Sequence, residues 1–205
     1  MSIKISLKFY PLRVLIFLSV VSVTVQAHEF TVLIVSSFTG PEATIGKSVR
    51  DGFLVASAEQ DGHPEETSNG HLGGLDVHLR NFNSTSSNFI NDLKHRINQE
   101  DVDMVVVVQQ ESSSNKVFAK LKNMDVVLVS TRKLPFTGLP ATAPTADKFV
   151  QDFRLRFSYE PDRFAAQGYQ LARRIADAVR PFDSVADKSA LRQRLESSLH
   201  SNILW

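Results

Sequence analysis

The sequence contains no cysteine among its 205 residues. It can therefore form no disulfide framework, carry no lipid anchor on cysteine and use no thiol as a nucleophile. It also lacks the Gly-x-Ser-x-Gly elbow of the serine hydrolases and the HExxH and HxH patterns of metal sites. Asp147 and Asp152 have no evident partners for a catalytic triad. We therefore expect no enzymatic activity and no cofactor.

Excess charge of one sign is also missing, because the formal net charge is only +1. A nucleic-acid-binding domain normally carries a clear basic excess, so we expect no nucleic-acid partner. Beyond the first 27 residues, no stretch approaches the roughly 20 apolar residues that a membrane-spanning helix needs. We therefore expect no membrane span in the mature chain.

The first 27 residues have the pattern of a secretory signal peptide. Lys4, Lys8 and Arg13 form a positive leader, an apolar run follows from Val14 to Val25, and Ala27 ends a small-residue cleavage site. An uncleaved membrane anchor is the less favoured alternative. Cleavage would leave a periplasmic domain of residues 28–205, which is large enough to bury a core. It would also make the formal charge slightly negative.

A Gly-Lys-Ser triplet at residues 46–48 resembles the end of a phosphate-binding loop. That loop needs four residues between its first glycine and the triplet, but five residues lie between Gly40 and Gly46. Pro41 stands where the first glycine should be, and proline has no N–H to offer a phosphate. The spacing therefore argues against a nucleotide site.

Strand and helix patterns alternate along the chain. The alternation predicts a doubly wound, mostly parallel α/β sheet with strand order 2-1-3-4. The segment 102–108 is the most apolar of the mature chain and is expected to be the central strand. The predicted strands are 30–35, 75–82, 102–108 and 125–130, and the helices between them are 43–60, 86–99 and 112–123.

After the fourth strand the pattern changes to a proline-containing loop, residues 131–145, followed only by helices. Those helices are expected at 146–159, 162–179 and 185–199. In the second of them, an apolar stripe that includes Leu171 and Ile175 should pack on the sheet, with Gly168 permitting a close approach.

Three segments resemble the type I periplasmic solute-binding proteins, especially the branched-chain amino-acid and amide-binding group. They are "GPEATIGKSVRDGFLVASAEQDG" with "NGHLGGLDVHL", "LKHRINQEDVDMVVVVQQESSSNKVFAKLKNMDVVLVST" and "FVQDFRLRFSYEPDRFAAQGYQLARRIADAV". The resemblance implies a Rossmann-like lobe. Members of that family have two lobes, and the loop at 131–145 is too short to hold a second one. The chain therefore looks like a first lobe alone.

The resemblance also implies a ligand site at the carboxyl ends of the strands. Hydroxyls and amides after the third and fourth strands hold the ligand's carboxylate and ammonium in related amino-acid binders. The residues that match are Ser113, Ser114, Ser130 and Thr131, with Arg132 beside them. Serines and free N–H groups at a helix start suit an anion. The alternative is that the serines at 112–114 only cap the following helix.

Two function classes remain open. One is a periplasmic binding protein for a small, polar, carboxylate-bearing ligand, working with an ABC-type permease. The other is a one-lobed accessory or sensor protein that binds a protein partner and no small ligand. A homodimer that pairs strand-end edges would replace the missing lobe. A new N-terminal His28 could chelate copper, and His63 and His71 share a polar loop, but solvated loop histidines are the more common case.

Overall fold

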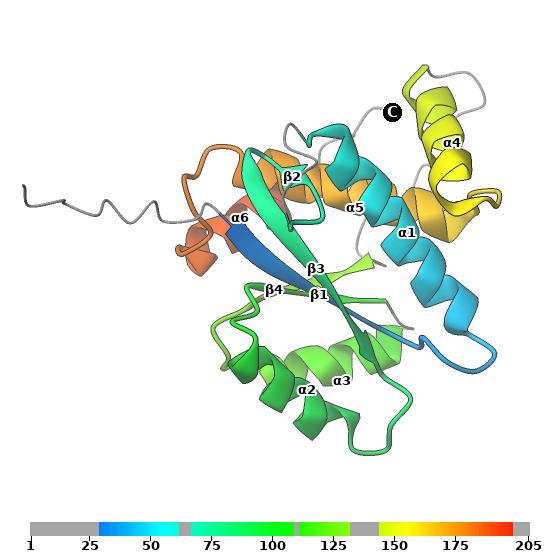
Figure 1. The fold of residues 1–205 in the computed structure, drawn as a ribbon. Coiled ribbons are helices and arrows are strands. Elements are labelled where there is room, and N and C mark those ends of the chain that lie inside the picture. Colours follow the sequence, from blue (N-terminus) through cyan, green and yellow to red (C-terminus); the bar gives the residue numbers. More distant parts are fainter. Residues whose placement is uncertain (1–28, 62–66, 109–110, 132–143, 199–205) are drawn as a thin grey trace, which may run out of the picture.

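The computed structural model describes residues 29–61, 67–108, 111–131 and 144–198. A five-stranded sheet with the order β2-β3-β1-β4-β5 forms the middle layer, and helices cover both of its faces (Figure 1). Strands β3, β1, β4 and β5 are parallel to one another. The predicted doubly wound fold and its 2-1-3-4 strand order are therefore confirmed.

The elements follow the predicted alternation closely. Helix starts and ends differ from the expected ones by no more than a few residues, which is the usual margin for helix ends. The strands are β1 (Glu29–Ser36), β2 (His71–Leu72), β3 (Leu75–Asn83), β4 (Met104–Val107) and β5 (Val127–Ser130). The helices are α1 (Ala43–Glu59), α2 (Phe89–Gln99), α3 (Glu111–Leu121), α4 (Pro144–Phe157), α5 (Arg163–Val179) and α6 (Lys188–Ser198).

The middle of the sheet is β1, not β4 as the hydrophobicity of the segment 102–108 suggested. Strand β2 accounts for the difference, because it pairs antiparallel with β3 and adds a fifth strand on that side of the sheet. It has only two residues and lies among glycines, so the sequence shows no alternating apolar pattern that would predict a strand there. Strand β4 is still an interior strand, fully buried between β1 and β5.

The side chains of β1 alternate between two separate hydrophobic cores. Val32 and Ile34 belong to the core under α1, α4, α5 and α6, whereas Leu33 and Val35 belong to the core under α2 and α3. Figure 1 shows these two groups of helices on opposite faces of the sheet. A strand buried on both faces explains why the segment 30–35 is an uninterrupted apolar run.

Helix α5 packs against α1 at very close range. A Cβ atom added to Gly168 would lie 2.0 Å from the carbonyl oxygen of Val49. One added to Gly52 would lie 1.8 Å from the carbonyl oxygen of Ala165. The predicted close approach at Gly168 is therefore confirmed, but its partner is the backbone of α1 and not the sheet.

Candidate functional site

The carboxyl ends of the four parallel strands meet at one edge of the sheet. Ser36 at the end of β1 is in register with Asn83 at the end of β3. On the other side, Val107 of β4 is in register with Ser130 of β5. The predicted ligand shelf therefore has the expected framework, in which four strand ends lie side by side.

The structure brings three of the predicted site residues to this part of the sheet. Ser130 ends β5, Thr131 follows it, and Ser114 lies near the start of α3, the helix after β4. All three are buried, with exposures of 3% for Ser114, 4% for Ser130 and 2% for Thr131. These three side chains are therefore almost wholly covered in the structure.

The two other predicted residues cannot be placed in the same way. Ser113 lies within α3, but its side chain is outside the described part of the structure, and Arg132 is outside the described residues altogether. Helix α3 begins at Glu111, so Ser112 to Ser114 lie in its first turn. The capping hypothesis required one of these serines to be the N-cap residue instead. The first-turn position still suits an anion, because the N–H groups there have no partner within the helix.

Hydrogen bonds hold the ends of β5 and β1 in place. The side-chain amide of Gln167, from α5, donates to the carbonyl oxygen of Thr131 at 2.8 Å. The hydroxyl of Ser36 donates to the carbonyl oxygen of Val108, just beyond β4, at 3.4 Å. The edge is thus built from the strands and from α5 together.

A second group of polar residues lies on the same edge, near β1 and β3, and was not among the predicted site residues. Asn83 accepts a hydrogen bond from the Phe38 N–H at 3.1 Å and donates to the Thr39 hydroxyl at 2.9 Å. The hydroxyls of Thr39 and Thr85 are 3.3 Å apart, and both residues are exposed. An asparagine at a strand end was the available signal, but only the tertiary fold shows which loops it joins.

The Gly-Lys-Ser triplet has a structural role within α1. A Cβ atom on Gly46 would lie 2.6 Å from the Ser36 hydroxyl, so the glycine lets the helix approach the end of β1. The Lys47 ammonium lies 4.9 Å from the centre of the Tyr159 ring. The Ser48 hydroxyl donates to the Asp162 carboxylate at 3.1 Å. These contacts account for all three residues without a nucleotide.

A buried carboxylate lies between α1 and the segment before α5. Asp51 is fully buried, pairs with Arg50 at 2.6 Å and accepts a hydrogen bond from the Tyr159 hydroxyl at 2.9 Å. Burial and the hydrogen bond to Asp51 raise the pKa of Tyr159 well above its usual value. Both oxygens of this carboxylate have partners, and removing one of those partners would leave a buried charge uncompensated.

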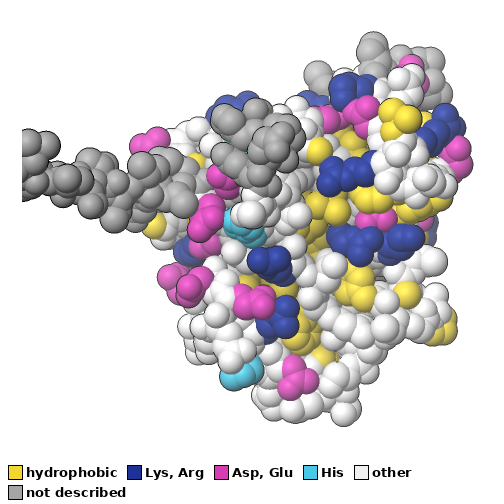
Figure 2. All heavy atoms as spheres, viewed as in Figure 1, with side chains coloured by type: hydrophobic (Ala, Val, Ile, Leu, Met, Phe, Trp, Pro, Cys, Tyr) yellow, Lys and Arg dark blue, Asp and Glu magenta, His cyan; other side chains and the backbone are white. Residues whose placement is uncertain are grey.

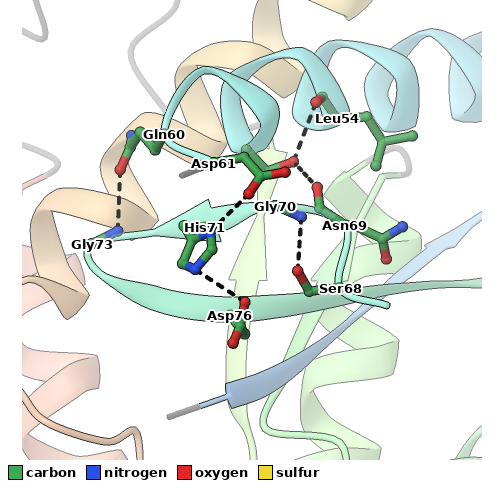
Figure 3. Close-up of polar contacts among 10 residues, drawn as sticks. Leu54, Gln60, Asp61, Ser68, Asn69, Gly70, His71, Gly73 and Asp76 are labelled. Carbon is green, nitrogen blue, oxygen red and sulfur yellow. Dashed lines mark hydrogen bonds and ion pairs between the residues drawn. The ribbon is translucent and has the colours of Figure 1, made fainter. Parts of the chain in front are cut away.

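The histidine of the polar loop lies at the other end of the sheet. His71 bridges two carboxylates, with Nδ1 at 3.3 Å from Asp61 and Nε2 at 3.1 Å from Asp76 (Figure 3). Asp76 is in register with Glu29, at the start of β1, so this cluster is far along the strands from the shelf. Figure 3 also shows hydrogen bonds from Gly73 to Gln60 and from Gly70 to Ser68 that hold the hairpin in place.

Within the described residues, no group of three or more His, Asp or Glu side chains is arranged to hold a metal. The other histidines considered for a metal, His28 and His63, lie outside that part of the chain.

None of the described helices is long and apolar enough to cross a membrane. Figure 2 shows Lys and Arg side chains interspersed with Asp and Glu on the face that carries α1 and α4. This face therefore has no basic patch of the kind that binds nucleic acid.

Solved structures with the same architecture are solute-binding proteins of ABC transporters. One, from R. palustris in complex with benzoate, has 10% identity and a TM-score of 0.58, over 82% of this chain and 85% of that chain. The leucine-binding protein LivK of Thermotoga maritima has 13% identity and a TM-score of 0.54, over 81% and 87%. A substrate-binding protein from Sphaerobacter thermophilus has 11% identity and a TM-score of 0.53, over 82% and 86%.

The chain has the fold of one lobe of a type I periplasmic binding protein. The resemblance read from the sequence is thereby confirmed at the level of the fold. No family model matches the chain, and no curated protein matches it. In this type I lobe, the shelf at Ser114, Ser130 and Thr131 lies where ligands bind in doubly wound sheets generally, outside the carboxyl ends of the strands.

Proposed function

We propose that this protein is a periplasmic solute-binding protein for a small, polar, carboxylate-bearing ligand that it delivers to an ABC-type uptake system. The observation that carries the proposal is the position of Ser114, Ser130 and Thr131 at one strand-end edge of a type I lobe. Ser114 lies in the first turn of α3, where backbone N–H groups suit an anion, and serine and threonine hydroxyls can donate hydrogen bonds to an anionic oxygen.

The ligands named for two of the compared structures support the chemical class. One was solved with benzoate and the other is called a leucine-binding protein, and both molecules carry a carboxylate. We assign Ser113 and Arg132 to the same site because they adjoin the three hydroxyl residues in sequence. The proposal includes no catalytic residue, no metal and no cofactor.

Residues 1–27 are assigned as the signal peptide that directs the protein to the periplasm, and residues 28–205 as its single domain. In a two-lobed relative, the second lobe closes over the ligand and excludes water. One lobe leaves the ligand partly open to solvent, so fewer contacts form. We therefore expect weak binding, with a Kd of about 0.1 to 1 mM, which corresponds to about 4 to 5.5 kcal/mol.

Calorimetric titration with amino acids and small carboxylates, benzoate included, tests the proposal. A Ser114→Ala, Thr131→Ala double variant should lose the binding and keep the thermal unfolding transition. A Ser184→Ala, Ser197→Ala double variant removes two hydroxyls from exposed positions and should bind like the wild type. If the wild type binds no carboxylate and instead co-purifies with another periplasmic protein, the accessory function replaces this one.

A further inference from the structure

A groove of about 440 Å³ runs along the outer side of β5 and reaches Ser130, a residue of the shelf, at one end. Five consecutive residues, 126 to 130, form its floor. Strand β5 is the last strand in the sheet order, and it pairs with β4 on its inner side only, among the described strands. The groove therefore follows an edge strand.

Both walls of the groove carry apolar side chains. The helices that form them, α3 on one side and α5 and α6 on the other, lie on opposite faces of the sheet (Figure 1). One wall is formed by Phe118 and Leu121 of α3, and the other by Leu171 of α5 and Leu195 of α6. The floor follows the same division, because Leu128 packs with the core under α3 and Val129 with the core under α5. Both faces of a strand laid beside β5 would thus meet apolar side chains.

The backbone of β5 alternates between its two sides. The Val127 N–H donates to the Asp103 carbonyl oxygen beside β4 at 2.9 Å, so Val127 points inward. The Val126 carbonyl oxygen accepts from Arg192 of α6 at 3.3 Å, so Val126 points outward. By the alternation of a strand, the N–H and carbonyl groups of Leu128 also point outward, into the groove.

The charged side chains around the groove are mostly cationic. Lys122, Arg174 and Arg192 line it, together with one acidic residue, Glu196. Lys122 and Arg192 are exposed, whereas Arg174 is buried. An apolar segment with acidic residues at its ends would suit both the walls and this rim.

We infer that the outer edge of β5 binds an extended, mainly apolar segment of about five residues, flanked by acidic residues, from another polypeptide. The segment joins the sheet as a sixth strand and exchanges backbone hydrogen bonds with Leu128. This is an interaction surface for a protein partner. It shares Ser130 with the shelf, but it does not rest on the proposed function.

The probe is the acetylated peptide Glu-Glu-Val-Thr-Val-Leu-Val-Glu-Glu, titrated into the full protein. Two versions of the peptide carry N-methyl groups on alternate backbone amides of the apolar part, one version on each alternate set. Comparing them distinguishes strand addition from simple apolar contact. One should bind about tenfold more weakly than the parent, because it loses the hydrogen bonds that face β5, and the other should bind like the parent. Equal binding of the two versions would overturn strand addition.

Amide hydrogen exchange supplies a second readout at the strand itself. Exchange of the Leu128 N–H should slow when the peptide binds, whereas that of Val127, already bonded to the carbonyl of Asp103, should stay the same. A Leu128→Pro variant should lose peptide binding, because it removes the outward N–H. The variant should still fold, since proline is tolerated on the outer side of an edge strand. If this variant does not fold, the two N-methylated peptides decide the question.

Three other outcomes would overturn the inference. One is no binding of the parent peptide. Another is protection of Leu128 that rises with protein concentration and not with peptide, which would show a second copy of the chain at the edge. The third is peptide binding only after removal of residues 199–205, which would show that the chain's own last residues fill the groove.

Discussion

Gly168 of α5 lies directly against the backbone of Val49 of α1, with no room between them for a methyl group. Gly52 of α1 meets Ala165 of α5 in the same way. Two glycines, one from each helix, therefore set the distance at which α1 and α5 cross. This contact joins the first helix of the lobe to one of its last.

We expect Gly168→Ala to destabilise the protein, because its methyl group would overlap the Val49 carbonyl and force the helices apart. Overpacking of this kind typically costs about 1 to 3 kcal/mol, more than the helix propensity gained from alanine. Denaturant unfolding measures the effect. Asp177→Ala, at an exposed position of α5, is the control and should change stability by less than about 0.5 kcal/mol. A Gly168→Ala protein as stable as the wild type would show that the helices are not in close contact.

Stability should fall above about pH 10 because of two tyrosines. Burial, with hydrogen bonds to Asp51 and Glu59, raises the pKa of Tyr159 and Tyr169 above their ordinary value of 10.0. The unfolded chain loses these protons first, so the free energy of unfolding is unaffected below that pH and decreases above it. Thermal unfolding from about pH 9 to about pH 12 measures the slope. A Tyr159→Phe, Tyr169→Phe variant should show a flatter slope, and an identical slope would exclude the two tyrosines as its cause.

Asp162 is the N-cap residue of α5, and we expect its carboxylate to stabilise the start of that helix. Its carboxylate accepts hydrogen bonds from the N–H groups of Phe164 and Ala165, at 2.9 and 2.8 Å, and from the Ser48 hydroxyl. Asp162→Ala should cost about 1 to 2 kcal/mol, the usual range for loss of an N-cap. Asp162→Asn keeps an acceptor oxygen and should recover most of that loss. Equal losses in the two variants would point to the charge and not to the cap.

The protein secreted to the periplasm should begin at His28. Intact-mass measurement of periplasmic material would show removal of residues 1–27 at the Ala27 site. Replacing Ala27 by a bulky residue such as Phe should slow the cleavage and leave precursor in the membrane fraction. Wild-type protein that keeps Met1 would mean that the leader acts as an anchor.

Much of the fold could be predicted because its signals are local. The apolar run of β1 and the stripe of α5 require only a few neighbouring residues to be recognised. Strand β2 could not be found in this way, because His71 and Leu72 become a strand only through pairing with β3. The position of β1 at the middle of the sheet follows from that missed strand.

The position of the candidate site at the strand ends could be predicted from the sequence, but the burial of its side chains could not. Ser130 and Thr131 end a strand, and a parallel sheet brings strand ends to one edge. Their near-complete burial depends on packing with distant elements, such as the contact between Gln167 and Thr131. The Asn83 cluster depends on a similar long-range contact, with the loop after β1. Such contacts leave no periodic trace in a sequence.

The crossing of α1 and α5 also sets the order in which the lobe can be assembled. Ser48 and Asp162, which meet at this crossing, are separated by 114 positions along the chain. A core that depends on contacts so distant closes slowly, because a long loop must be ordered before they form. Until α5 packs, the face of α1 that carries Val49 and Gly52 has no cover. The last third of the chain therefore decides when the protein reaches its native state.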